Sequence, residues 1–266
     1  MPAADASVPP AAGGNGARPV SGRARLRAAI SAGRAVRGTF VKLAGEEPVD
    51  LVKAAGADFV VVDLEHSQLS EEQARRAVSR AAAIGLPALV RIPAVDSGLI
   101  NRLLEAGAAG IQLSTLRSAA ETAALLSATR YAPTGSRSIS LAHPGANYSG
   151  VPLADYLAAE RAAPPILVGQ IETATTVDPL PDVVRGLDVA FLGVTDLAVS
   201  IGLGESGAFE ERVREIRAAA GTSGSWCATP AAAAAAEAAG DRYVVIGSDL
   251  QFLAGSLRNL FTEGNR

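Results

Sequence analysis

The sequence predicts a (β/α)8 barrel, that is, a TIM barrel. About eight short apolar runs alternate with helical segments, which is the order of a parallel α/β fold. The length of 266 residues also suits a barrel, which typically takes about 250 residues. The alternative is an open doubly wound sheet, but the first strand leads into Leu43-Ala44-Gly45-Glu46, which contains no G-x-G-x-x-G phosphate-binding turn.

Each predicted strand is a short apolar run bounded by turn residues, as expected for strands buried on both faces of a parallel sheet. The second run ends abruptly in two carboxylates and an imidazole, those of Asp63, Glu65 and His66. The strands are predicted at 38–43, 59–63, 88–92, 110–113, 166–171, 189–192, 224–228 and 243–246.

Capping residues define the predicted helices. Ser70 precedes one helix that stops at Gly85, and Thr229-Pro230 opens an alanine-rich helix that stops at Gly240. The alanine run therefore reads as a helix packed closely on the sheet. The helices are predicted at 21–31, 48–55, 70–84, 97–106, 118–129, 153–161, 182–185, 209–220, 230–239 and 248–260.

The chain is predicted to hold one folded domain. Residues 1–20 form an Ala/Pro/Gly-rich extension that we expect to be disordered, and residues 21–266 form the barrel. The formal net charge of -3 gives no electrostatic case for nucleic acid or a membrane surface, and no apolar run approaches the ~20 residues that span a bilayer. The single cysteine, Cys227, excludes an intramolecular disulfide and fits a cytoplasmic location.

Residues 131–165 break the alternation of strands and helices and are rich in Gly, Pro, Ser and Asn. A long irregular segment of this kind is more often a functional loop or lid than an accident. His143 lies in it; we expect a solvated loop histidine, with a histidine that reaches the site from above as the alternative.

Barrel geometry brings the carboxyl ends of all strands to one rim, where active sites of this fold lie. The polar residues predicted at these ends are Asp63, Glu65, His66, Arg91, Gln170, Glu172 and Asp196. Their convergence from distant parts of the sequence is the strongest functional signal in the chain.

These residue types suit proton removal next to a metal-bound carbonyl. Glu172 and Asp196 end neighbouring strands, and two close carboxylates favour a bridging cation; an all-oxygen site suits Mg²⁺ or Mn²⁺. Arg91 can stabilise a carboxylate or oxyanion, and His66 can act as a general base. The alternatives are helix caps for the carboxylates and a rim salt bridge for Arg91.

Three further residues rank lower as candidates. Lys42 ends the first strand, where a lysine could form a Schiff base, although a metal pair and a histidine make that redundant. Trp226 and Cys227 are expected to belong to the seventh strand and its packing.

From about residue 25 to the C-terminus, the chain resembles the HpcH/HpaI aldolase family of class II, metal-dependent pyruvate aldolases. The motifs that carry the resemblance keep the family's order and spacing. They are Asp63-Leu64-Glu65-His66, Val90-Arg91, Leu103-Leu104-Glu105-Ala106-Gly107, residues 128–138, Gln170-Ile171-Glu172-Thr173 and Gly193-Val194-Thr195-Asp196-Leu197.

The resemblance implies an aldehyde-lyase that cleaves a 4-hydroxy-2-oxo acid into pyruvate and an aldehyde. Glu172 and Asp196 would bind the divalent metal, Mg²⁺ or Mn²⁺ with Co²⁺ as an alternative. The family typically forms homohexamers with an exchanged C-terminal helix, here residues 248–261. The resemblance implies four catalytic residues: His66 as the base, Arg91 to stabilise the enolate, Asp63, and Glu105 as the acid that supports the histidine and that a neighbouring subunit can supply. Gln170 and the backbone near Thr195 would bind the oxo-acid substrate.

The chain departs from the family's usual pattern in two places, at Gly193-Val194, where Gly-Pro is usual, and in the long segment at 140–150. The metal and base positions are intact, so the departures concern the acceptor aldehyde. Three alternatives remain: an oxaloacetate decarboxylase or related enolate enzyme, a citrate-lyase-like enzyme acting on CoA esters, and a barrel that binds a ligand without turnover.

Overall fold

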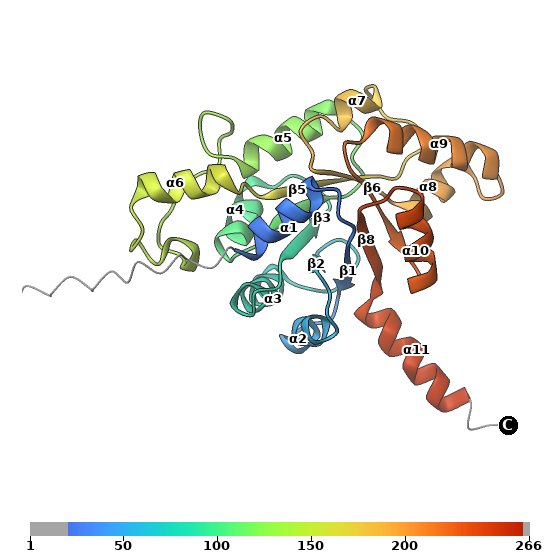
Figure 1. Ribbon diagram of the computed structural model, residues 1–266, viewed down its shortest axis with the longest axis horizontal. Helices are drawn as coiled ribbons and strands as arrows, with labels where there is room; N and C mark the ends of the chain where they lie inside the picture. The colour runs from blue at the N-terminus through green and yellow to red at the C-terminus, as the bar shows by residue number, and fades with distance from the viewer. Residues whose placement is uncertain (1–20, 263–266) are drawn as a thin grey trace, which may run out of the picture.

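Eight parallel strands close into a barrel in the order of the chain, so that each strand pairs with its sequence neighbours and β8 pairs with β1 (Figure 1). The computed structural model describes residues 21–262. The predicted (β/α)8 fold is confirmed. The strands are β1 (Val36–Val41), β2 (Phe59–Asp63), β3 (Ala88–Ile92), β4 (Gly110–Leu113), β5 (Ile166–Ile171), β6 (Val189–Leu192), β7 (Ser223–Cys227) and β8 (Tyr243–Ser248).

Helices surround the barrel, and those predicted agree with the observed ones to within a few residues. Ser21, Ser70, Ser118 and Thr229 cap their helices through side-chain oxygens, as their sequence context indicates. The helices are α1 (Gly22–Ser31), α2 (Glu47–Ala54), α3 (Glu71–Ala83), α4 (Ser97–Glu105), α5 (Ala119–Thr129), α6 (Leu153–Ala162), α7 (Leu180–Val183), α8 (Val194–Ile201), α9 (Ser206–Ala219), α10 (Pro230–Ala238) and α11 (Asp249–Thr262), with a 3-10 turn at Pro144–Ala146.

The core has an inner and an outer layer, because side chains alternate along each strand. In β2, Val61 packs inside the barrel, whereas Val60 and Val62 face the helix layer. Stacked rings of Phe59 and Tyr243, with centroids 4.4 Å apart, fill the interior. Helix α1 adds apolar side chains to this inner cluster, so the barrel is a packed core whose accessible chemistry lies at the rim.

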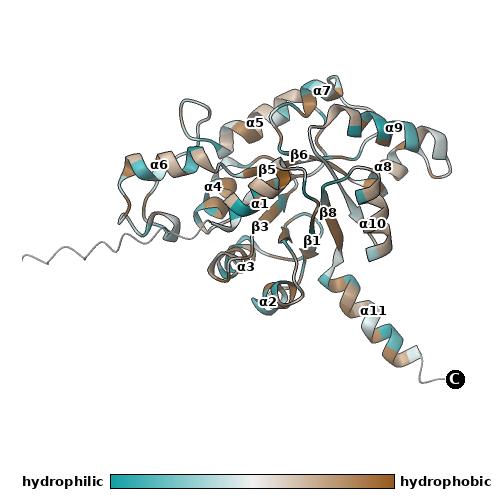
Figure 2. Ribbon diagram, viewed as in Figure 1, coloured by the Kyte–Doolittle hydropathy of each residue, from teal (hydrophilic) through white to brown (hydrophobic). Residues whose placement is uncertain are grey.

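Helix α11 extends away from the barrel (Figure 1), and Figure 2 shows apolar residues along it. None of its residues is buried, and Phe252, Leu253, Leu257, Leu260 and Phe261 are exposed. Beside its first turns, a mainly apolar groove of about 720 Å³ runs over β1 and α2. Phe252, Leu253 and Ser256 of α11 line this groove, so helix and groove form one apolar surface that residues 21–262 leave uncovered.

The irregular segment 131–165 connects α5 to β5 and packs beside α4: the Arg137 Nε donates to Asn101 Oδ1 at 2.9 Å. The expectation that His143 is solvated is wrong. Its side chain lies against the Tyr156 ring, with centroids 5.5 Å apart, and the residue is 6% exposed. Since a segment between a helix and the next strand returns to the amino end of the barrel, this one approaches β5 from the side opposite the catalytic rim.

The domain predictions fall on different parts of the chain. Residues 1–20 lie outside the described residues, and the single folded domain from residue 21 onward stays a prediction. Within residues 21–262, no helix is long and apolar enough to cross a bilayer.

Candidate active site

A cavity of about 480 Å³ lies at the carboxyl ends of the strands. Residues from all parts of the chain meet there, which is what the barrel prediction requires. Its lining consists of Phe40, Lys42, His66, Arg91, Gln170, Phe191, Gly193, Val194, Thr195, Asp196, Trp226, Ser248, Leu250 and Gln251.

Asp63 organises one side of the site without lining the cavity. Its carboxylate is fully buried, at the end of β2. Burial raises the pKa of this group, but hydrogen bonds and charge from Arg91, together with the charge of Lys42, lower the pKa below its ordinary value. Asp63 is therefore an ionised anchor. Oδ1 accepts from Arg91 Nε (2.8 Å), Glu65 N (3.1 Å) and His66 N (3.2 Å), and Oδ2 accepts from Arg91 Nη2 (2.6 Å). Oδ2 also forms an ion pair with Lys42 Nζ at 3.1 Å.

Arg91 is held in one orientation. Two of its nitrogens bind Asp63, and Nη1 lies 3.2 Å from Glu65 Oε2. The guanidinium carbon lies 4.3 Å from the centroid of the Phe40 ring, which adds a cation–π contact. The rim salt bridge is therefore present, and Arg91 still lines the cavity with 6% of its side chain exposed. A fixed, partly accessible guanidinium of this kind suits an oxyanion.

His66 is the accessible group on this side. Its side chain is 56% exposed and its Nε2 lies 3.7 Å from Glu65 Oε2. Its backbone N–H donates to Asp63, so the same carboxylate fixes the guanidinium of Arg91 and the backbone from which the imidazole projects. The predicted meeting of Asp63, Arg91 and His66 is observed.

Glu172 lies on the other side, at the end of β5, and is nearly fully buried. Its Oε1 accepts from the N–H and the hydroxyl of Thr115 at 2.8 and 2.6 Å, and Oε2 accepts from Gln170 Nε2. Burial raises the pKa of Glu172, because the hydrogen bonds from Thr115 and Gln170 do not offset the loss of solvation, and the negative charge of Glu65 raises the pKa further. Gln170 is oriented in turn by Gln112 Nε2, 3.0 Å from its Oε1.

Asp196 lies in the first turn of α8 and lines the cavity. Helix α8 follows β6 directly after Gly193, and a Cβ on Gly193 would lie 2.6 Å from Glu172 Cβ and collide with its Oε2. Glycine thus lets Glu172 lie against the start of α8, the helix whose first turn carries Asp196. This cradle and the uncompensated burial of Glu172 fit a divalent cation held by two carboxylates.

The described residues contain no group of three or more His, Cys, Asp or Glu that could hold a metal ion. A site with two protein ligands does not depend on such a group, because substrate oxygens and waters complete the shell of Mg²⁺.

Glu105 does not join the cavity within this chain. It lies at the end of α4, where Asn101 Nδ2 donates to its Oε1 at 3.2 Å. Its proposed support of a histidine therefore concerns a neighbouring subunit and stays a prediction.

Several functional candidates escaped sequence reasoning. Gln112, which orients Gln170, lies within β4, and Thr115, which binds Glu172, follows that strand. A polar residue at a strand end is a signal that the sequence offers. Trp226 was assigned to strand packing, but it lines the cavity from β7, whereas the buried Cys227 packs with the outer layer. Lys42 lies at the cavity wall in an ion pair with Asp63.

Residues 37–251 match the family model described as HpcH/HpaI aldolase/citrate lyase. A 4-hydroxy-2-oxovalerate aldolase of Novosphingobium aromaticivorans is 30% identical over 193 residues, which cover 70% of each chain. A 4-hydroxy-2-oxo-heptane-1,7-dioate aldolase of Salmonella arizonae is 30% identical over 85% of this chain and 89% of its own. Among solved structures, an HpcH/HpaI aldolase from Desulfitobacterium hafniense DCB-2 superposes with a TM-score of 0.82 at 25% identity, covering 91% of this chain and 97% of its own.

Proposed function

Because this chain belongs to the HpcH/HpaI aldolase/citrate lyase family, we propose that it is a divalent-metal-dependent aldolase that acts on 4-hydroxy-2-oxo acids through a pyruvate enolate. The family and the aldolase-type function predicted from the sequence are confirmed. Metal dependence, the substrate and the residue roles are the proposal. The observation that carries it is the cavity that His66, Arg91, Gln170 and Asp196 share, with Glu172 in contact with Gln170.

Glu172 and Asp196 would hold the metal, Mg²⁺ or Mn²⁺, which when bound supplies a Lewis acid for the 2-oxo group. The first N–H groups of α8, around Thr195, lack helical partners and face a region that favours anions, so they would bind the pyruvate carboxylate. Gln170, fixed by Gln112, would hold a substrate oxygen.

His66 and Arg91 would carry the proton transfer and the developing charge. In the cleavage direction, His66 accepts the proton of the 4-hydroxyl, the bond between C3 and C4 breaks, and the aldehyde leaves. The electron pair becomes the enolate of pyruvate, whose oxygen Arg91 stabilises by hydrogen bonding. His66 then returns the proton to C3, which completes pyruvate.

We also propose a homo-oligomer in which α11 exchanges between subunits. The first turns of α11, with the exposed Phe252 and Leu253, form one wall of the apolar groove over β1 and α2, so helix and groove make one apolar surface that a second copy of this chain would cover. Among residues 21–262, the buried hydroxyl of Thr39 at this groove has no hydrogen-bond partner, as expected where a second chain completes the packing. The number of subunits, six by resemblance, and the cytoplasmic location stay predictions.

The test is exchange of the methyl protons of pyruvate in D2O, followed by NMR with and without Mg²⁺ or Mn²⁺. Exchange requires enolate formation and no acceptor. We expect metal-dependent exchange that falls by about 10²- to 10⁴-fold in His66→Ala, the usual contribution of a general base. Calorimetric titration of Mn²⁺ into the same variant should give unchanged affinity. Metal-dependent exchange at the wild-type rate in His66→Ala would contradict the assigned base. Carbon dioxide release from oxaloacetate, measured in parallel, identifies the decarboxylase alternative.

A further inference from the structure

A row of hydrogen-bonded side chains crosses the apolar interior of the barrel and ends at a proposed metal carboxylate. The Tyr243 hydroxyl, from β8, donates to Gln112 Oε1 at 3.4 Å. Gln112 Nε2, from β4, donates to Gln170 Oε1 at 3.0 Å, and Gln170 Nε2, from β5, donates to Glu172 Oε2. All four residues of this polar row are at most 5% exposed, so a donor or acceptor without a partner here would lie unpaired in an apolar environment.

The carboxylate at one end fixes the direction of the polar row. Glu172 accepts hydrogen bonds at both of its oxygens, so Gln170 turns its NH2 group toward it. The Gln170 oxygen then accepts from Gln112, whose own oxygen is left for a donor in the barrel interior. Among residues 21–262, the Tyr243 hydroxyl is the one donor that reaches this oxygen. Without that hydroxyl, a buried acceptor would have no partner.

Aromatic rings hold Tyr243 in one place. Its ring stacks on Phe59 with centroids 4.4 Å apart and packs edge-on against Phe191 with centroids 6.0 Å apart. Phe191 also lines the cavity, so the phenol lies directly behind the cavity wall. Burial raises the pKa of the Tyr243 hydroxyl well above its ordinary value, and the group therefore remains a donor near neutral pH. Tyr243 is in this way a preorganised donor.

We propose that Tyr243 is a positioning residue, which acts through Gln112 to fix the orientation of the Gln170 amide in the cavity. The inference rests on the proposed function, in which Gln170 binds a substrate oxygen. The NH2 group of Gln170 has two protons; one is donated to Glu172, and the other is left for the substrate. Because Gln112 occupies the Gln170 oxygen, Gln170 meets the substrate as a donor, which suits a carbonyl or carboxylate oxygen.

The experiment uses Tyr243→Phe, which removes the hydroxyl and keeps the stacked ring. The measured quantities are kcat and KM for metal-dependent exchange of the pyruvate methyl protons. We expect KM to rise by about threefold to tenfold, the effect of losing one neutral hydrogen bond. The value of kcat should change by less than about twofold, because Gln170 contacts the substrate equally in the ground state and the transition state.

Gln112→Met removes both links between Tyr243 and Gln170 and should give the same pattern. Adding Tyr243→Phe to Gln112→Met should change KM no further, since both substitutions interrupt the same row. A further rise of KM in the double variant, equal to that in Tyr243→Phe alone, would show that Tyr243 does not act through Gln112 and would overturn the inference.

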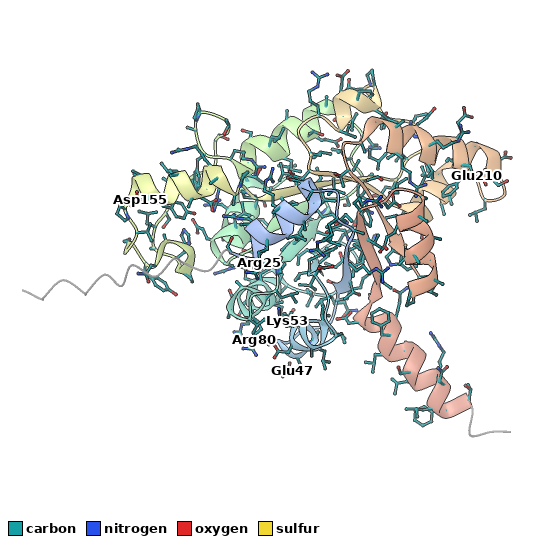
Figure 3. The ribbon with its side chains drawn as sticks, in the orientation of Figure 1. Arg25, Glu47, Lys53, Arg80, Asp155 and Glu210 are labelled. Carbon is teal, nitrogen blue, oxygen red and sulfur yellow. The ribbon has the colours of Figure 1, made fainter. Side chains whose placement is uncertain are left out.

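Tyr156→Phe is the matched control, because it removes a hydroxyl from another buried tyrosine. Tyr156 is 6% exposed, and its hydroxyl lies 3.2 Å from that of Tyr131. It follows Asp155 in α6, which lies beside the barrel and not within it (Figure 3). This control should keep the wild-type KM. If Tyr243 has a structural role alone, Tyr243→Phe lowers the unfolding temperature and keeps the wild-type KM, which overturns the inference.

A measurement that needs neither pyruvate nor metal separates this inference from the proposed function. The unfolding equilibrium constant in urea is measured for Tyr243→Phe, for Gln170→Met and for the double variant. Independent sites would give multiplicative effects. We expect the effect of Tyr243→Phe to be at least about threefold smaller in the Gln170→Met background, because Gln112 is then free to turn. Multiplicative effects would overturn the inference, whereas coupling in a protein that does not exchange pyruvate would support the positioning of Gln170 and refute the proposed function.

Discussion

Replacing Gly193 with alanine tests the arrangement of the proposed metal ligands with one methyl group. A Cβ at this position would lie 2.6 Å from Glu172 Cβ and 3.1 Å from Gln170 Nε2, and it would overlap Glu172 Oε2. Ordinary contact begins at 3.4 Å, so Glu172 must move by close to 1 Å, a displacement that can cost about 10²-fold in rate at a catalytic site. Overpacking adds about 1–3 kcal/mol of destabilisation.

The assay for Gly193→Ala has three parts. Thermal unfolding reports whether the variant folds, calorimetry with Mn²⁺ reports the carboxylate pair, and pyruvate exchange reports the chemistry. We expect a folded protein with weaker Mn²⁺ binding and exchange reduced by about 10²-fold. Gly207→Ala is the control, because a Cβ there meets nothing within 4 Å and the residue lies in α9; it should leave both quantities unchanged and stabilise slightly. A folded Gly193→Ala with wild-type Mn²⁺ affinity would refute the reasoning.

Three further changes probe other parts of the molecule. Asp63→Asn leaves the buried guanidinium of Arg91 without its anion and should lower the free energy of unfolding by about 3–5 kcal/mol in urea titrations; a loss below about 1 kcal/mol would count against the anchor role. Burial raises the pKa of Asp241, but Arg217 and two serines lower it below its ordinary value. The ionised carboxylate therefore stabilises the fold above the unfolded pKa of about 3.9, and this contribution is lost as pH falls through the folded pKa. The difference in free energy of unfolding between wild type and Asp241→Asn should shrink from about pH 6 to about pH 3, and a constant difference would contradict the prediction. In α11, the pair Phe252→Asp and Leu253→Asp should lower the mass measured by light scattering, whereas Asn259→Asp should not; an unchanged assembly in the pair would remove the proposed exchange.

Local signals were sufficient for most of the fold. The run from Phe59 to Asp63 coincides with β2. In a parallel sheet, an apolar stretch that is followed directly by charged residues forms a buried strand, and the charged residues lie at its end. Helix α8 was missed because Gly193, which precedes it, provides no side-chain cap. His143 was misjudged because the Gly and Pro content of its segment indicates solvent, whereas its burial comes from Tyr156, which is distant in sequence.

Some residues of the candidate site could be predicted from local sequence, whereas others depend on tertiary contacts. Strand ends identify Asp63, Arg91 and Glu172 as rim residues, because the fold fixes where strands end. The contact between Thr115 and Glu172 depends on a backbone with φ of 48° at Thr115 and on strand register, which no local pattern encodes. Whether Trp226 lines the cavity depends on which of the two alternating faces of β7 points inward. The sequence of this short strand does not determine that.

Asp249 connects the start of α11 to the wall of the cavity. It starts the helix that leaves the barrel, and its carboxylate holds the backbone on which Lys42 stands, while the next two residues of α11 line the cavity. Glu172 is held from Thr115 and Gln170, away from this joint. A shift of α11 relative to the barrel therefore alters the cavity wall at Leu250 and Gln251, while Glu172 keeps its supports. If α11 exchanges between subunits as proposed, the shape of this cavity wall depends on quaternary structure.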